Sequence, residues 1–152
     1  MTLEPLDVNA LAFEATKRWV PEALKKDIDL GFEGDEHAII VRGEPGRLHE
    51  LLDNLLDNAV RYTRTGGRVT VRTSAHPHPI VTVSDDGPSI PLEERKRIFE
   101  RFHRLLGSPR DGSGLGLSIA LEIARIHGAE IRLSDDLDGV GNTFSVHFPA
   151  AA

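Results

Sequence analysis

An α+β fold, in which helices cover one face of a mixed sheet, is predicted by three features of the sequence. The chain has 152 residues, the usual size of one domain, and 39% of them are hydrophobic, which suffices for a sizeable core. Two segments, "RVTVRTS" and "IVTVSD", alternate apolar and polar residues as strands of a half-buried antiparallel sheet do. Segments with helical spacing stand before and after them. We therefore expect a two-layer α/β sandwich as a single domain over residues 1–152, with the second sheet face partly exposed to water.

The first expected element is a helix over residues 8–20. Asp7 is a suitable cap for its start, and Pro21 lies near its end. Two short β-like runs follow, "IDLGF" (28–32) and "AIIVR" (38–42).

The strongest helical pattern in the chain begins at Pro45 and stops at residues 63–67. Its leucines recur at the spacing of a core-facing helix side. The remaining elements follow in chain order: strands at 68–74 and 80–85 joined by the hairpin loop "AHPHP", helices at 91–103 and about 114–127, and the closing strands "EIRLS" and "NTFSVHF".

Composition and charge exclude several classes of function. The formal charge is −6, from 24 acidic and 18 basic residues, whereas proteins that bind nucleic acids normally carry a basic surplus. There is no cysteine, so a disulfide framework and thiolate metal sites are excluded. No apolar run approaches the roughly 18 residues that a membrane span needs, and the N-terminal residues do not resemble a signal peptide. We expect a soluble chain that contacts neither nucleic acid nor membrane. A soluble part of a larger membrane protein is compatible with this expectation.

Three polar residues share one edge of the helix that begins at Pro45. At 100° per residue, Asn54, Asn58 and Arg61 fall within a sector of roughly 60°, apart from the leucines. An ordinary solvated face is one interpretation, although asparagine has poor helix propensity. The other is a ligand site, in which an asparagine oxygen binds Mg²⁺, Arg61 meets a phosphate and Tyr62 covers an adenine.

Two acids end the strand at 80–85 and lead into a turn with Gly87 and Pro88. A plain turn accounts for the glycine and the proline. It does not account for Asp85, whose carboxylate could accept a hydrogen bond from the exocyclic amine of adenine and would not suit the carbonyl of guanine.

The stretch "DGSGLGL" (111–117) precedes an expected helix and contains three glycines, Gly112, Gly114 and Gly116. A flexible hinge and a phosphate-binding loop are both compatible with it, since the amides of a helix start attract anions. The dinucleotide fingerprint is excluded because Leu117 stands where its third glycine belongs and no strand precedes the loop. A Walker loop is excluded because no lysine follows the glycines.

Five segments in this order resemble the conserved boxes of one family. "LLDNLLDNAVRYT", "SDDGPSIP", "RIFERFHR", "DGSGLGLSIA" and "GVGNTFSVHF" are similar to the N, G1, F and G2 boxes and the closing strand of the catalytic ATP-binding domain of sensor histidine kinases. The resemblance covers residues 28 to 149. It implies the Bergerat ATP-binding fold, shared with gyrase, Hsp90 and MutL-type ATPases, and the cofactors ATP and Mg²⁺.

The resemblance assigns roles by position. Asn58 corresponds to the Mg²⁺ ligand, Asn54 lines the phosphates, and Arg104 reaches the γ-phosphate; these three are the implied catalytic residues. Residues 105–113 correspond to a short ATP lid. The implied ATP-binding residues are Asn54, Asn58, Arg61, Tyr62, Asp85, Gly87, Ser89, Ile90, Arg104, Gly112, Ser113, Gly114, Leu115, Gly116, Leu117 and Thr143, the last as an adenine-side contact.

One position departs from the family pattern. Ser89 stands where the D-x-G-x-G motif has its second glycine. Its side chain is expected to crowd the nucleotide or to require an unfavourable φ, which would lower the affinity for ATP.

The implied function is that of the catalytic domain of a histidine kinase, which donates the γ-phosphoryl group to a histidine on a separate dimerisation domain for relay to a response regulator. His49-Glu50 imitates the acceptor motif H-E-x-x-x-P but lacks its proline, so we expect no autophosphorylation of this chain alone. The implied setting is a cytoplasmic domain of a membrane sensor, and the chain by itself is expected to be a monomer.

Three rival functions remain. A hydrolytic ATPase of the same fold carries a glutamate base one turn before the metal asparagine, where this chain has Asn54, and Asp53 and Asp57 are expected to point elsewhere. A serine kinase of the anti-sigma type lacks the F box. A purely regulatory nucleotide-binding module is compatible with Ser89.

Overall fold

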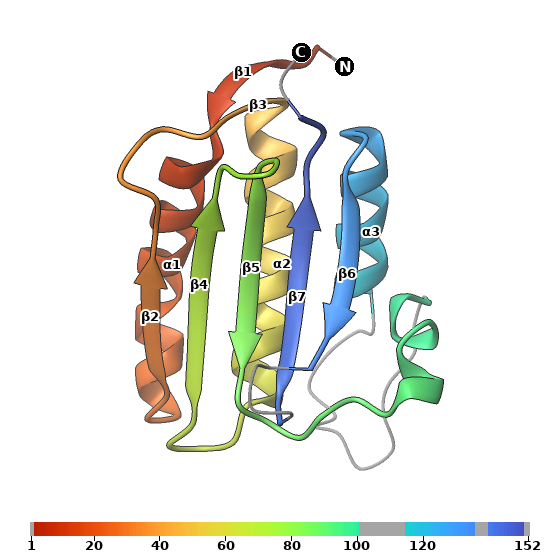
Figure 1. Ribbon diagram of the computed structural model, residues 1–152. Helices are drawn as coiled ribbons and strands as arrows, with labels where there is room; N and C mark the ends of the chain where they lie inside the picture. Colours follow the sequence, from red (N-terminus) through yellow and green to blue (C-terminus); the bar gives the residue numbers. More distant parts are fainter. Residues whose placement is uncertain (1, 101–114, 136–139, 151–152) are drawn as a thin grey trace.

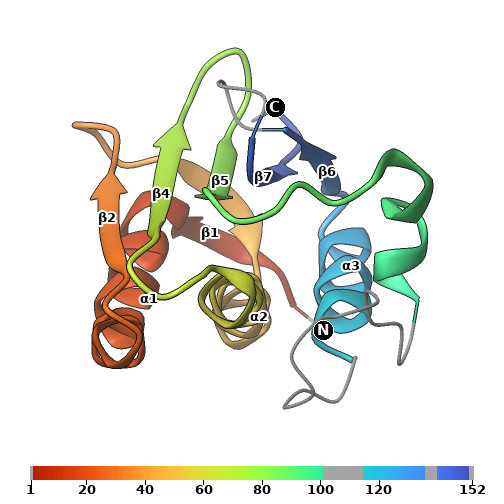
Figure 2. The ribbon, with the colours of Figure 1, turned by 90° about the horizontal axis from the view of Figure 1, so that it is seen from below.

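Three helices cover one face of a five-stranded sheet in the computed structural model, which describes residues 2–100, 115–135 and 140–150 (Figure 1). The strand order is β2-β4-β5-β7-β6, with β2 parallel to β4 and the other neighbours antiparallel. Seen from below, α1, α2 and α3 lie side by side beneath the sheet (Figure 2). The predicted α+β two-layer sandwich is confirmed. No helix in the described ranges is long and apolar enough to cross a membrane.

The first helix, α1 (Val8–Lys25), is longer than expected. Asp7 caps it as predicted, accepting a hydrogen bond from Asn9 N at 3.0 Å. The helix continues past Pro21 for another turn, because Ala23 is buried in the core and the segment after it is fastened to α2. Burial and tertiary contacts thus outweigh the one backbone hydrogen bond that the proline removes.

A second, two-stranded sheet was not predicted. It pairs β1 (Glu4–Asp7) with β3 (Ile40–Gly43) in antiparallel register. The sequence EPLD of β1 has no alternating pattern, and its proline can occupy this position because each strand of the pair is an edge.

The polar residues of the site are carried by α2 (Pro45–Tyr62), the helix at the centre of the layer. Its N-cap Glu44 accepts hydrogen bonds from the amides of Gly46 and Arg47, at 3.2 and 2.6 Å. Seven residues with helical spacing bury one side of it: Leu48, Leu51, Leu52, Leu55, Leu56, Ala59 and Val60.

Side-chain contacts hold the C-terminal end of α2 and its outer face to the rest of the fold. At its C-terminal end, Lys26 Nζ donates to the carbonyls of Val60, Arg61 and Thr63 at 2.9, 3.0 and 2.7 Å. A cation at this end also complements the helix dipole. On its outer face, Asp53 accepts from Trp19 Nε1 and an Arg18 nitrogen, at 2.9 and 3.0 Å.

The strands of the large sheet are β2 (Asp29–Glu33), β4 (Arg68–Ser74), β5 (Ile80–Asp85), β6 (Glu130–Ser134) and β7 (Asn142–His147). Val69, Val71, Val81, Val83, Phe144 and Val146 are buried on the helix-covered face. The residues between them lie on the open face and are polar or half-exposed, as the alternation predicted.

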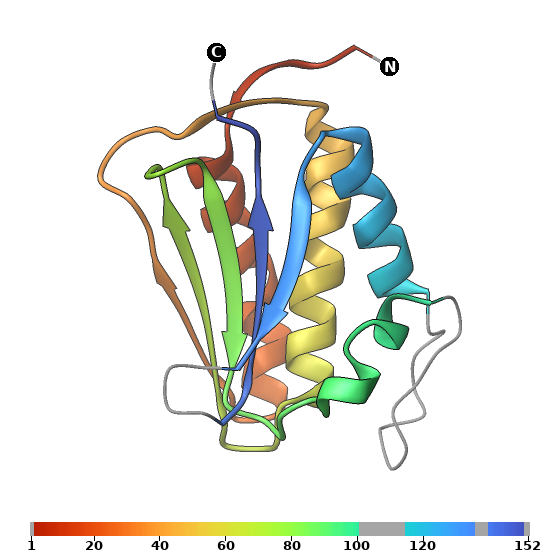
Figure 3. The same cartoon turned by 45° about the vertical axis from the view of Figure 1, so that its right-hand side comes forward.

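The expected helix over 91–103 is wrong for the part that the structure describes. Two short 3₁₀ helices, η1 (Leu92–Glu94) and η2 (Arg97–Phe99), replace it, and Glu100 has an extended backbone. Arg95 is anchored by its guanidinium, and Phe99 packs edge-on against Phe144 with ring centroids 6.1 Å apart. These two anchors, only four residues apart, hold the segment in short turns. The segment lies beside α3 (Gly116–Ile126), a helix that agrees with the one predicted at about 114–127 (Figure 3).

Candidate nucleotide-binding site

The predicted site residues that the structure describes gather at one end of the sheet, the lower end in Figure 1. This end contains the last residue of β5, the second half of α2, the start of α3 and the start of β7. Arg104, Gly112, Ser113, Gly114 and the lid over 105–113 lie outside the described residues.

Asn54 of α2 faces the start of α3. A Cβ built on Gly116 would lie 3.6 Å from Asn54 Oδ1, so the two motifs, 62 positions apart in sequence, are neighbours in space. The Asn54 Nδ2 atom is buried and has no hydrogen-bond partner in the described part of the chain. Since an unpaired buried donor is costly, this atom calls for an acceptor such as a phosphate oxygen.

The start of α3 offers further donors to an anion. No side chain in the described ranges caps the helix. Leu115, the residue before it, has a helical backbone, and Ser118 donates its hydroxyl to the Leu115 carbonyl at 2.8 Å. Leu117 is half-buried and packs against the core. Among the described residues, the first amides of α3 therefore have no side-chain acceptor, which is the arrangement that binds phosphates at helix starts.

Asn58 and Arg61 continue the polar edge of α2. Asn58, one turn after Asn54, is half-buried. An Arg61 guanidinium nitrogen contacts both carboxylate oxygens of Asp57, at 3.0 and 3.2 Å. Asp53 thus points away from this edge, toward α1, as expected. Asp57, in contrast, is engaged with Arg61 at the edge itself.

A single carbonyl ligand from Asn58 is compatible with Mg²⁺, although the described residues contain no group of three His, Cys, Asp or Glu side chains that could hold a metal ion. Mg²⁺ usually takes most of its ligands from water and phosphates, with one or two protein oxygens. The donor set of the asparagine edge therefore fits a metal that arrives together with a nucleotide.

The end of α2 touches the turn that follows β5. A Cβ built on Gly87 would lie 3.2 Å from the Tyr62 carbonyl and 3.1 Å from Asp85 Oδ1. A side chain at this position would require the Tyr62 carbonyl or the Asp85 carboxylate to shift by a few tenths of an ångström. The backbone of half-buried Tyr62, at the end of α2, therefore lies close to the turn that contains Asp85 and Gly87.

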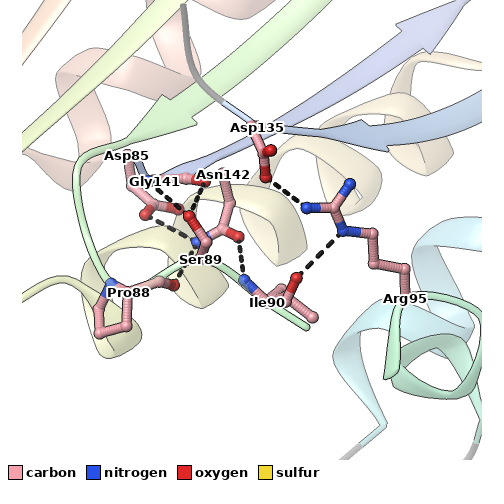
Figure 4. Close-up of polar contacts among 8 residues, drawn as sticks. All are labelled: Asp85, Pro88, Ser89, Ile90, Arg95, Asp135, Gly141 and Asn142. Carbon is pink, nitrogen blue, oxygen red and sulfur yellow. Dashed lines mark hydrogen bonds and ion pairs between the residues drawn. The ribbon is translucent and has the colours of Figure 1, made fainter. Parts of the chain in front are cut away.

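Asp85 is a buried carboxylate, 5% exposed, at the end of β5. Its Oδ1 accepts hydrogen bonds from Gly87 N at 2.9 Å and from Asn142 Nδ2 at 3.2 Å. A carboxylate at this depth with two donors on one oxygen has a fixed orientation. Figure 4 shows the contact with Asn142.

Asn142, the first residue of β7, is a site residue that the sequence analysis missed. Its amide also donates to the Pro88 carbonyl at 2.9 Å and accepts from Ile90 N at 2.8 Å, so it joins the turn to the sheet (Figure 4). The available signal was strand parity: in "NTFSVHF", the asparagine has the same parity as buried Phe144 and Val146 and therefore points inward.

The expectation for Thr143 is corrected by the same parity. Its hydroxyl lies 3.0 Å from that of Ser84, and the two residues are cross-strand partners on the open face of the sheet. Asp85 and Asn142 pair on the opposite, helix-covered face. Thr143 is therefore not brought together with Asp85.

Ser89 does not have the unfavourable φ that was one of the two expectations for it, and its hydroxyl is engaged with the backbone. Among the described residues other than glycine, only Asp27 has a positive φ. The Ser89 hydroxyl donates to the Gly141 carbonyl at 3.2 Å and accepts from the Gly141 amide at 3.1 Å. It thus fastens the turn to the start of β7 (Figure 4).

Arg95 forms the outer boundary of this network. Its Nε donates to the Ile90 carbonyl at 3.1 Å, and its guanidinium forms a short ion pair with Asp135, which follows β6 (Figure 4). The turn, the 3₁₀ segment and the ends of β6 and β7 are therefore one connected unit.

Comparisons with known proteins agree with this geometry. The family model described as "Histidine kinase-, DNA gyrase B-, and HSP90-like ATPase" matches residues 43–152. The chain is 36% identical to the swarming motility regulation sensor protein RssA of Serratia marcescens and 35% identical to the sensor protein kinase PmrB of Pseudomonas aeruginosa, with 98% and 95% of this chain covered. It spans about a third of these relatives, 32% and 30% of their lengths.

Solved structures of the same kind superpose over nearly the whole chain. The catalytic domain of the histidine kinase ThkA has a TM-score of 0.86 at 28% identity and covers 100% of both chains. The mycobacterial sensor histidine kinase MprB has a TM-score of 0.83 at 31% identity, with 97% of both chains covered.

Proposed function

Since the chain belongs to the family of histidine kinase-, DNA gyrase B- and HSP90-like ATPases, and its relatives are sensor histidine kinases, we propose that it binds Mg-ATP and donates the γ-phosphoryl group to a histidine on a separate dimerisation domain. The phosphoryl group would then pass to an aspartate of a response regulator. In this function the chain is the ATP-dependent catalytic half of a protein-histidine kinase.

One observation carries the proposal: α2 joins the two halves of the site. Asn54 lies beside the uncapped start of α3, and Tyr62, about 12 Å further along the helix axis, lies beside the Asp85 turn. A nucleotide lying along α2 would have its phosphates at Asn54 and its adenine at Asp85 and Gly87.

The residues of this chain would contribute positioning and charge, which are most of what phosphoryl transfer asks of a protein. Asn54 and the α3 amides donate to phosphate oxygens, and Arg61 exchanges Asp57 for a phosphate. Asn58 would hold Mg²⁺, which neutralises phosphate charge when bound. Arg104 is proposed to reach the γ-phosphate. In the transfer, a bond forms between the acceptor nitrogen and phosphorus, the bond from phosphorus to the β–γ bridging oxygen breaks, and ADP leaves.

Rapid hydrolysis is the rival that the site geometry disfavours. A water-activating base would have to lie one turn before Asn58, where Asn54 cannot take a proton. The neighbouring Asp53 is held by Trp19, Arg18 and His49, whose Nδ1 lies 3.1 Å from Asp53 Oδ2. The residue that is phosphorylated distinguishes the other two rivals from a histidine kinase. A serine kinase would phosphorylate a serine of its partner, and a regulatory module would phosphorylate no residue.

Two variants test the binding site. Calorimetric titration with Mg-ATP should show weaker binding for Asn58→Ala and for Asp85→Ala, with unchanged circular dichroism. Unchanged affinity in both variants would refute the site. As a control, Ser145→Ala removes a hydroxyl from the open face of β7 and should bind like the unaltered chain.

Phosphotransfer is tested by adding a dimerisation domain in trans. Labelled ATP should give acid-labile, base-stable label on that domain and none on this chain, because His49 lacks the acceptor motif and is engaged with Asp53. Label retained on this chain alone would contradict the proposed division of labour.

The proposed partners follow from this role. They are the dimerisation domain of the parent kinase and its response regulator, with this chain as a cytoplasmic domain of a membrane sensor and a monomer by itself. Light scattering of the purified chain tests the last point.

A further inference from the structure

We infer that Asn142 is a positioning residue that makes the site selective for adenine, because its amide sets the orientation of the Asp85 carboxylate. The inference rests on the proposed function, in that it assumes Asp85 reads the exocyclic amine of the base. It adds a residue of the closing strand whose side chain acts through Asp85.

The Asn142 amide is fixed in one orientation. It is 5% exposed, and its NH₂ group donates to Asp85 Oδ1 and to the Pro88 carbonyl while its oxygen accepts from Ile90 N. A flipped amide would place its oxygen against a carboxylate and a carbonyl, which have no hydrogen to donate. The side chain therefore fits its three partners in only one way.

This orientation determines where the Asp85 carboxylate points. Oδ1 is engaged by Gly87 N and Asn142 Nδ2 from two directions, so rotation of the group would break both contacts. A carboxylate only accepts hydrogen bonds, so it favours the amine at position 6 of adenine and disfavours a carbonyl there. Selectivity requires that this acceptor be preorganised, since a mobile carboxylate could turn away from the carbonyl.

Ser89 supports the same turn from a second point. Its hydroxyl exchanges two hydrogen bonds with the Gly141 backbone, directly before Asn142. Gly141 itself is tightly placed: a Cβ there would lie 2.1 Å from the Asp85 carbonyl oxygen. The segment from Pro88 to Ile90 is thus joined to the start of β7 by both side chains, so its position does not depend on the glycine that Ser89 replaces.

The test combines a protein change with a ligand change. Dissociation constants for Mg-ATP and for Mg-inosine triphosphate (Mg-ITP), which has a carbonyl in place of the amine, are measured for the unaltered chain and for Asn142→Ala. We expect the variant to lose about tenfold in affinity for ATP and little for ITP. A merely structural role would weaken both ligands equally. Ser145→Ala, on the same strand but its open face, should leave both constants unchanged.

Asn142→Thr provides a second variant in case the alanine variant does not fold. Threonine is shorter and keeps a hydroxyl donor in a strand position, so we expect its preference for ATP over ITP, measured as the ratio of the two affinities, to lie between those of the unaltered chain and Asn142→Ala. If only the threonine variant folds, its preference should be lower than that of the unaltered chain. An unchanged ratio in every folded Asn142 variant would overturn the inference.

Asp85→Ala separates the inference from the proposed function. One outcome is that the unaltered chain prefers ATP, that Asp85→Ala abolishes this preference, and that the Asn142 variants keep it. In that case the inference fails and the proposed function stands. If the unaltered chain binds ATP and ITP equally, the inference fails while Mg-ATP binding and phosphotransfer still stand. If it binds neither nucleotide, both the inference and the proposed function fail.

Discussion

Gly141 has the most crowded backbone position among the described glycines. Its φ is +92°, and a Cβ would lie 2.1 Å from the Asp85 carbonyl oxygen. Gly66 has a similar φ of +84° but open space around it, and Gly31 has open space without a positive φ. Comparison of the three glycines therefore distinguishes the cost of a positive φ from the cost of a steric clash with neighbouring atoms.

The predicted order of destabilisation on substitution by alanine is Gly141, then Gly66, then Gly31. Gly66→Ala should cost about 1 kcal/mol in left-handed strain, Gly31→Ala close to zero, and Gly141→Ala about 3 kcal/mol or more. Urea denaturation measures the three differences. Equal losses at Gly141 and Gly66 would show that the contact with Asp85 does not constrain the strand.

His147 on the open sheet face makes stability depend on pH. Partial burial, followed by the charges of Arg132 and His78, lowers the pKa of His147, against a smaller opposing effect of Glu130. Its Nδ1 lies 2.9 Å from His78 Nε2. Because the folded-state pKa is below the unfolded value of 6.5, the unfolded chain binds more protons in this range.

Stability should therefore be fully present above pH 6.5 and decrease as the pH falls below it. Urea midpoints between pH 8 and 5 should decrease less for His147→Phe than for the unaltered chain. The difference should be modest because solvent screens a half-exposed ring. Parallel pH profiles for the two proteins would refute this assignment.

The sequence predicted the placement of polar residues well where a helix carries them. Asn54, Asn58 and Arg61 share one edge of α2 by simple angular spacing, which needs no partner to be known. Asn142 was missed, and Thr143 was named instead. Parity with Phe144 indicates which face each residue occupies, but the contact of Asn142 with Asp85 also depends on how β7 pairs with β5.

Elements were predictable in proportion to the pattern within them. β4 and β5 have the expected bounds because apolar residues alternate along their lengths. β1 exists only through its pairing with β3, so its four residues carried no signal. The segment of η1 and η2 has the spacing of an α-helix, but the contact of Arg95 with the Ile90 carbonyl limits it to short 3₁₀ turns.

Lys26 is predicted to control the last turn of α2. Lys26→Met keeps most of the side chain but removes all three donors, and we expect a loss of about 1–2 kcal/mol in stability. Lys25→Met is the matched control, since Lys25 is exposed and its one ion pair within the described residues is with Glu22 on its own helix. Equal effects of the two changes would refute the role of Lys26.

Tyr62 reports on the same turn directly. It is the only tyrosine in the sequence, so 3-fluorotyrosine gives a single fluorine resonance on the residue that ends α2. That resonance should shift or broaden in Lys26→Met and remain unchanged in Lys25→Met.

Nucleotide binding should stabilise the whole molecule, because the site combines α2, α3, β5 and β7 and cannot exist in the unfolded chain. At 100 times Kd, Mg-ATP adds about 2.7 kcal/mol, which corresponds to roughly 5–10 °C in Tm for a chain of this size. Asn58→Ala should remove the difference between Mg²⁺ and EDTA in this shift. A magnesium effect retained in that variant would place the metal elsewhere.

The contact between Trp19 and Asp53 gives the molecule an internal optical reporter. Trp19 is the only tryptophan, and its indole nitrogen donates to a carboxylate on α2, one residue before Asn54. Indole emission responds to such a neighbouring charge, so the fluorescence of the unlabelled protein monitors the seam between α1 and α2. Any ligand that displaces α2 would be visible without a dye.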